Sequence, residues 1–153
     1  KHVQQFLKEG HLRWDSLGEF LAIVVSLEHL SEKNNNPKAK VLSCCLDLAI
    51  ENLLKNGKSP KRKSGEIDNR GSHFYLALFW AEELSKQSDD EFLKSDFELI
   101  FQKLKAKESD IISELSTSNL GATVIDGYYY PDLDAIAKSM RPSITFNSII
   151  DKI

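Results

Sequence analysis

The sequence predicts an all-α fold, an irregular multi-helix bundle. Apolar residues recur every three or four positions over most of the chain, as they do on the buried face of a helix. Residues that typically end or begin helices, such as Gly10, Pro37 and Gly57, separate these periodic segments. Only the segment 122–125 is short and rich in β-branched side chains, which leaves open one short strand near 122–126.

Size and charge indicate one globular domain. The chain has 153 residues, of which 41% are hydrophobic and 28% charged. Its net charge of -3 argues against nonspecific nucleic-acid binding, which needs a broad positive surface. No apolar run approaches the roughly 18 residues of a membrane helix. We therefore expect a single helical domain over 1–153, with neither nucleic acid nor membrane as a partner.

The first half predicts three helices. Residues 1–9 have helical spacing from the first position, and the chain starts without Met, so we expect a piece of a longer protein. A second helix runs to about Leu30, with Asp15 or Ser16 as its cap and Glu19, three positions after Ser16, as a capping-box partner. The third covers 37–55, with a proline at its first position.

The second half predicts four more helical segments. Residues 69–87 carry aromatic and apolar side chains on most sides, which is typical of a helix at the centre of a core. Residues 88–116 continue the helical period, with an expected break near 95–96. Two short helices, 132–140 and 143–153, end the chain.

No catalytic set is recognisable. The four histidines have no metal-ligand spacing, and there is neither a nucleophile elbow nor a nucleotide-binding glycine motif. Cys44 and Cys45 are adjacent, and on a helix their side chains diverge by about 100°, so they cannot pair without distorting the backbone. We read both as buried thiols in a reducing compartment, and we expect the protein to be cytoplasmic.

The segment 59–81, SPKRKSGEIDNRGSHFYLALFWA, is the most distinctive stretch. A basic loop leads directly into the aromatic helix, whose first turn has unpaired N–H groups and a partial positive charge. This combination suits an anion such as a phosphate. The alternative is a solvated basic loop followed by an ordinary capped helix. We expect His73 and Trp80 to act through packing.

Four segments in chain order carry a resemblance to a known family. They are KHVQQFLKEGHLRWDSLGEF (1–20), the segment 59–81, DGYYYPD (126–132) and MRPSITFN (140–147). Together they resemble the C-terminal region of the monomeric NADP-dependent isocitrate dehydrogenases of bacteria. The resemblance implies that the chain is like the last fifth of a larger α/β enzyme and forms part of its discontinuous small domain.

The resemblance also implies an activity and its partners. The parent enzyme oxidatively decarboxylates isocitrate to 2-oxoglutarate, transfers a hydride to NADP and uses Mg or Mn. Its metal ligands, and most groups that hold isocitrate, belong to the N-terminal domains of the same polypeptide. We therefore expect no catalytic or metal-binding residue in this chain, which alone would be inactive.

The resemblance assigns this chain the adenosine end of the NADP site. Matching residues would hold the 2′-phosphate, with an acid beside them that orients an arginine or a ribose, and two neighbours at the start of the helix 69–87. The residues expected to hold the 2′-phosphate are Lys1, His2, Arg13 and Arg62. The acid is Asp15, and the two neighbours are Arg70 and Ser72. Donors left unpaired when the phosphate is absent would select NADP over NAD.

A second hypothesis is that the chain has the same helical scaffold but takes no part in catalysis. The chain would then be a non-catalytic helical module for interaction or anion binding. Retention of four cations that repel one another favours the enzyme. Nucleic-acid binding through KSPKRK is weaker, because the run is short and the chain as a whole is acidic.

Overall fold

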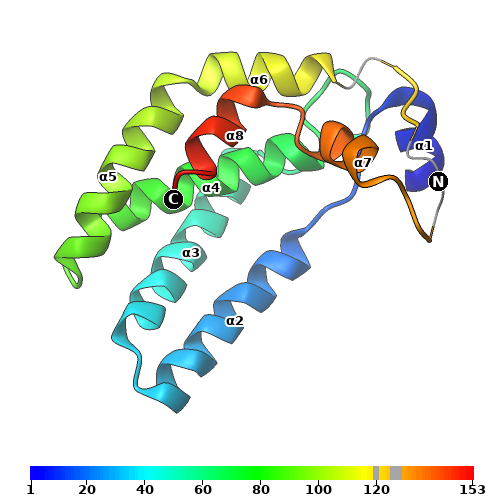
Figure 1. Ribbon diagram of the computed structural model, residues 1–153. Coiled ribbons are helices and arrows are strands. Elements are labelled where there is room, and N and C mark those ends of the chain that lie inside the picture. The colour runs from blue at the N-terminus through cyan, green and yellow to red at the C-terminus, as the bar shows by residue number, and fades with distance from the viewer. Residues whose placement is uncertain (119–120, 125–128) are drawn as a thin grey trace. The chain divides into compact units, whose positions relative to one another are not determined.

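A computed structural model describes residues 1–118, 121–124 and 129–153, which form helices and no strand. The prediction of an all-α fold is therefore confirmed (Figure 1). Residues 122–124 of the possible strand are not in a strand, and 125–126 lie outside the described residues. The helices are α1 (His2–Glu9), α2 (Leu17–Asn34), α3 (Pro37–Lys55), α4 (Asn69–Lys86), α5 (Glu91–Ala106), α6 (Glu108–Thr117), α7 (Leu133–Met140) and α8 (Ile144–Ile150).

Most helix ends lie where the sequence places them. Helix α1 ends at Gly10, which adopts a left-handed conformation (φ 67°) and donates its N–H to the Phe6 carbonyl. Before α3, the Asn36 side chain accepts the Ala39 N–H at 3.2 Å. Ser16 makes no such side-chain bond at the start of α2.

The expected break near 95–96 is wrong. Helix α5 continues through those positions, because Ser95 and Asp96 are exposed and an exposed polar pair leaves the apolar face intact. The helix instead ends at Ala106, and α6 begins at Glu108. Between them Lys107 has a non-helical φ of -105° and bonds Asp110 at 2.9 Å. No glycine or proline marks this position.

The chain divides into two compact units, each assembled from separated segments. The division falls inside α4. The first unit comprises Lys1–Trp14, Ser59–Phe74 and Ala106–Ile153, and the second comprises Asp15–Lys58 and Tyr75–Lys105. That 1–153 form a single domain stays a prediction.

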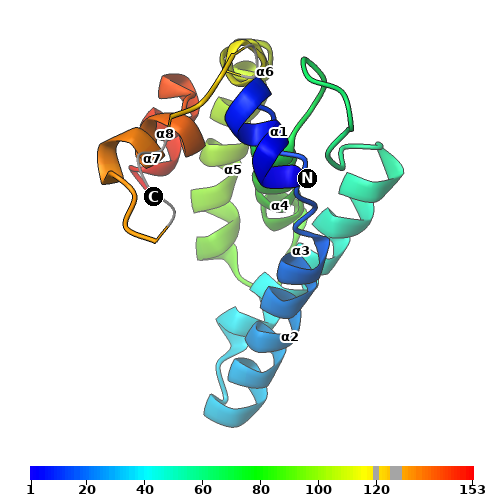
Figure 2. The same ribbon diagram turned by 90° about the vertical axis from the view of Figure 1, so that its right-hand side faces the viewer.

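In the second unit, α2 and α3 form a helical hairpin (Figures 1 and 2). The buried Ser43 hydroxyl donates to the Val24 carbonyl at 3.1 Å, which satisfies a polar group between the two helices. Trp80 acts through packing, as expected, and its indole N–H donates to the Leu42 carbonyl at 3.1 Å. The apolar cluster around it consists of Val41, Leu42, Cys45, Trp80, Leu84, Leu93 and Phe97.

The two cysteines differ in exposure. Cys45 is buried, whereas Cys44 is exposed, so the prediction of two buried thiols is wrong for Cys44. Neighbouring side chains on a helix point about 100° apart, and here Cys45 faces the core whereas Cys44 faces solvent. Burial, and then Coulombic interaction with Cys44, Glu83 and Asp89, raises the pKa of Cys45 to about 11, so this thiol stays protonated at neutral pH.

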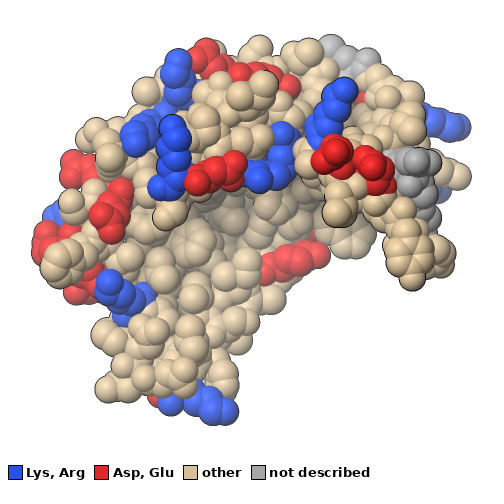
Figure 3. Space-filling model, in the orientation of Figure 1, with Lys and Arg blue, Asp and Glu red and all other residues tan. Residues whose placement is uncertain are grey.

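The second unit also exposes apolar surface on α2. Leu21, Ile23 and Val25 are 43%, 46% and 62% exposed. Figure 3 shows the face of the hairpin mostly without charged side chains. Among the described helices, none combines the length and the apolar character that a membrane crossing requires.

The first unit packs α4 against the C-terminal helices. Phe74 is fully buried and meets the Phe146 ring of α8 edge-on, with centroids 5.4 Å apart. Ile111 and Leu115 of α6 are also buried. The Thr123 N–H donates to the Leu7 carbonyl at 3.0 Å and joins the end of α1 to the segment after α6.

Gly10 and Gly18 form a matched pair for testing this fold. A Cβ at Gly10 would lie 2.7 Å from the Gly121 carbonyl oxygen and 2.8 Å from that of Ser118, on a residue whose φ is positive. We expect Gly10→Ala to lower the free energy of unfolding by about 1–3 kcal/mol. Gly18→Ala, in α2 with nothing within 4 Å, should raise it by up to about 1 kcal/mol. Urea unfolding measures both, and equal effects would contradict the assignment of strain to Gly10.

Candidate functional site

The first unit is organised around a buried ion pair at the start of α4. The Asp68 and Arg70 side chains are 1% and 4% exposed. Asp68 Oδ2 accepts from Arg70 Nε at 2.9 Å and from a terminal guanidinium nitrogen at 2.5 Å. Its Oδ1 accepts the backbone N–H groups of Arg70 and Gly71 at 3.0 and 3.3 Å. One carboxylate thus satisfies both the arginine and the unpaired donors of the first helical turn.

Arg70 also ties together distant parts of the chain. Its terminal nitrogens donate to the Gly10 carbonyl at 2.5 Å, at the end of α1, and to the Ser139 carbonyl at 2.6 Å, in α7. The guanidinium carbon lies 5.8 Å from the centre of the Phe6 ring. The structure therefore gives Arg70 an internal bonding role, and its expected place beside a cofactor stays a prediction.

The basic loop between α3 and α4 is fastened to the N-terminal segment. Gln5 Nε2 donates to the Arg62 carbonyl at 2.9 Å, and His11 Nε2 lies 2.8 Å from the Lys61 carbonyl oxygen. At the base of the loop, the Asn69 N–H donates to the Leu12 carbonyl at 2.8 Å. Figure 2 shows this loop running beside α1.

These bonds join two segments of the first unit, which carry the four residues expected to hold the 2′-phosphate. Lys1, His2 and Arg62 are exposed, and Arg13 is partly exposed. The His2 ring meets the Trp14 ring edge-on, with centroids 6.3 Å apart, which places the start of α1 beside the residue that follows Arg13. Lys1 and His2 stand at the N-terminus of α1, where side-chain N–H donors suit a phosphate.

The other two predicted residues have backbone-ordering roles. Asp15 belongs to the second unit, where its exposed Oδ1 accepts the Leu17 N–H at 3.0 Å and orders the start of α2. Ser72 is 2% exposed, and its backbone N–H donates to the Asp68 carbonyl at 2.9 Å. Their expected roles beside a cofactor stay predictions.

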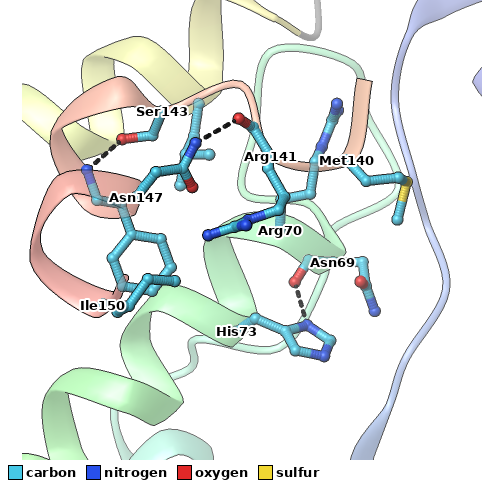
Figure 4. Close-up of a pocket in the computed structure, with 10 residues that line it drawn as sticks. Asn69, Arg70, His73, Met140, Arg141, Ser143, Asn147 and Ile150 are labelled. Carbon is cyan, nitrogen blue, oxygen red and sulfur yellow. Dashed lines mark hydrogen bonds between the residues drawn. The ribbon is translucent and has the colours of Figure 1, made fainter. Parts of the chain in front are cut away.

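A separate cavity of about 210 Å³ lies within the first unit (Figure 4). The lining residues are Asn69, Arg70, His73, Leu115, Met140, Arg141, Ser143, Phe146, Asn147 and Ile150. His73 Nδ1 lies 2.8 Å from the Asn69 carbonyl oxygen, and the side chain is exposed. The expectation that His73 is a packing residue is therefore wrong, because it stands on the one face of α4 that borders this cavity.

Glu114 of α6 fixes the helix beside the cavity. Its carboxylate accepts the Ser143 and Thr145 hydroxyls, each at 2.6 Å, and the Thr145 N–H at 3.1 Å. These bonds, the Ser143 hydroxyl first, lower the pKa of Glu114 below its ordinary value. The start of α8 is thus held by a charged acceptor on another helix.

Metal ligation was not expected in this chain. Across residues 1–118, 121–124 and 129–153, no group of three or more His, Cys, Asp or Glu side chains is placed to hold a metal ion.

Comparison with known proteins identifies a family. Residues 1–151 match the model of the monomeric isocitrate dehydrogenase family. The chain is 54% identical over 150 residues to the "Isocitrate dehydrogenase [NADP]" of Azotobacter vinelandii, covering 98% of this chain and 20% of that protein. It is 53% identical over 150 residues to "Isocitrate dehydrogenase [NADP] 2" of Psychrobacter sp. (strain 13A), with the same coverage.

A relative from Colwellia maris, named "Isocitrate dehydrogenase [NADP] 2", is 49% identical over 153 residues and 100% of this chain. The alignment covers 21% of the Colwellia protein. The chain therefore spans about a fifth of the length of the curated relatives that it matches.

Loss of the buried ion pair should destabilise the first unit. Asp68→Asn keeps the shape of the side chain but leaves the Arg70 charge buried without its counter-charge, which costs about 3–5 kcal/mol. The control is Asp151→Asn, which breaks the exposed pair with Arg141 (2.6 Å) and should cost less than about 1 kcal/mol. Urea unfolding of the two variants makes the comparison, and a similar cost for both would contradict the stabilising role of Asp68.

Glu114 should make stability depend on pH in the acid range. Because its folded pKa is lowered, its contribution to stability is present above its ordinary pKa of 4.5 and is lost as pH falls through the folded pKa. Glu114→Gln should therefore flatten the loss of stability below about pH 5. Urea midpoints measured against pH test this, with Glu98→Gln, an exposed position, as the control. An unchanged pH profile for the Glu114 variant would overturn it.

Proposed function

Because this chain belongs to the monomeric isocitrate dehydrogenase family, we propose that it is the C-terminal, cofactor-binding part of an NADP-dependent isocitrate dehydrogenase. Such an enzyme oxidatively decarboxylates isocitrate to 2-oxoglutarate and reduces NADP. The observation that carries this proposal is the family match over residues 1–151. The names of the Azotobacter, Psychrobacter and Colwellia relatives support the cofactor.

Within that enzyme, we assign to this chain the adenosine 2′-phosphate end of NADP. Lys1, His2, Arg13 and Arg62 would hold the phosphate, with Asp15 beside them. The exposed cations fit this group, because a phosphomonoester carries close to two negative charges and accepts several charge-assisted hydrogen bonds. NAD lacks the phosphate and would leave these donors without their acceptor, which favours NADP.

Arg70 and Ser72 would support the cofactor site without contacting the phosphate. Both are buried at the start of α4, and the Asp68–Arg70 pair joins that start to the end of α1. We propose that they hold the helix and the loop in place. The phosphate contacts come from the exposed residues.

The remaining parts of the reaction belong to the rest of the enzyme. We propose that Mg or Mn and isocitrate bind mainly to the N-terminal domains of the same polypeptide, which are the partners of this chain. When bound, the metal polarises the substrate hydroxyl and stabilises the developing enolate. We further propose a cytoplasmic location, which suits two unpaired cysteines.

Calorimetric titration of this chain tests the binding role. The ligands are 2′-phospho-adenosine diphosphate-ribose and its counterpart without the 2′-phosphate. We expect a salt-sensitive preference for the phosphorylated ligand. Arg13→Asp should reduce that preference about tenfold or more, because it removes a charged donor and adds repulsion. The control Lys152→Asp makes the same charge change at another exposed position of the first unit and should have little effect.

Equal binding of both ligands, or an equal effect of the two substitutions, would contradict the assigned site. The same chain, mixed with isocitrate, NADP and Mn, should form no NADPH, and steady turnover would contradict the placement of the catalytic groups elsewhere. A folded chain that binds neither ligand would mean that the pocket exists only when the rest of the enzyme closes over it, or that the chain is a repurposed scaffold.

A further inference from the structure

We infer that Gln5 and His11 are positioning residues, which hold the basic loop so that Arg62 is presented to the 2′-phosphate. This inference rests on the proposed function, because it concerns the same cofactor site. Neither residue belongs to the predicted binding set. Both act through the backbone of the loop.

The two side chains form hydrogen bonds with the carbonyl groups of two consecutive loop residues. Gln5 bonds the Arg62 carbonyl at 2.9 Å, and His11 lies 2.8 Å from that of Lys61. The loop also closes on itself, since the Lys61 N–H donates to the Ile67 carbonyl at 2.8 Å. The peptide groups on either side of Arg62 are therefore fixed from the N-terminal segment, while the Arg62 side chain stays exposed.

His11 has an unusual hydrogen-bond balance. It is fully buried, and its Nδ1 has no hydrogen-bond partner in the described part of the chain. A carbonyl oxygen only accepts, so Nε2 carries the hydrogen and Nδ1 is an acceptor without a donor. Burial of such a group costs free energy that an apolar residue of similar size would avoid. Within the residues that the structure describes, the bond to the loop is the one polar contact of this side chain that offsets the cost.

A fixed loop favours binding because the loop is already ordered before the ligand binds. An arginine on a mobile loop must lose conformational freedom when it binds phosphate, and this loss weakens the complex. Gln5 lies on α1, whose N-terminus carries Lys1 and His2. Its bond therefore links the position of Arg62 to that of two other predicted phosphate ligands.

The test uses the full chain and the two ligands of the titration above. His11→Leu and Gln5→Met remove the donors and keep approximate size. Each should reduce the preference for the 2′-phosphorylated ligand about threefold to tenfold. His11→Gln should restore it, because its amide nitrogen replaces Nε2 and the absent Nδ1 made no bond. Amide hydrogen exchange at Lys61 and Glu66, whose N–H groups are bonded within the loop, should rise in the first two variants and not in His11→Gln.

Arg62→Ala separates this inference from the proposed function. If Arg62→Ala removes the preference, whereas folded His11→Leu and Gln5→Met retain it, the positioning role is wrong and the proposed site stands. If Arg62→Ala retains the full preference, or the unsubstituted chain shows none, the proposed site at Arg62 fails and the positioning role with it. If His11→Leu does not fold, Gln5→Met decides, since Gln5 is only partly buried.

Discussion

The charge pair between Asp68 and Arg70 determines the arrangement of the first unit. Two buried charges must compensate each other, and here the carboxylate uses both oxygens while the guanidinium uses its remaining nitrogens on backbone carbonyls. Those carbonyls belong to Gly10 and Ser139, far apart in the sequence. The pair therefore does more than cap α4, because it sets where the end of α1 and the α7 segment meet that helix.

This arrangement separates the basic residues into two kinds. Arg70 is enclosed and bonds the protein itself, whereas Arg62 and Lys1 are exposed. An arginine that holds a scaffold and an arginine that meets a ligand look alike in a sequence, since both occur beside turns with small residues. Burial distinguishes them, and it is set by contacts with distant segments.

The sequence was sufficient for most helices, because periodicity and end residues act locally. It predicted α3 and α4 almost to the residue, with Pro37 and Asn69 at their starts. It failed at Lys107, where no helix-breaking residue marks the boundary between α5 and α6. Cys44 was placed wrongly because the period alone does not say which of two adjacent side chains faces the core.

The candidate site was predictable only where a family resemblance supplied it. The contacts that organise it span 50 residues from His11 to Lys61 and 56 from Leu12 to Asp68. No local pattern reports such contacts. An aspartate two residues before an arginine at a helix start was the one available signal for the ion pair, and it is common to many simple caps.

The division of the first unit among three segments has a consequence for synthesis. Residues 1–14 are synthesised well before residues 106–153, which belong to the same unit. Contacts between such distant segments form only after long loops close, which is slow. The second unit, by contrast, is complete by Lys105. Contacts of α1 with the later segment, such as the hydrogen bond from the Thr123 N–H to the Leu7 carbonyl, therefore form only after residues 106–153 have been synthesised.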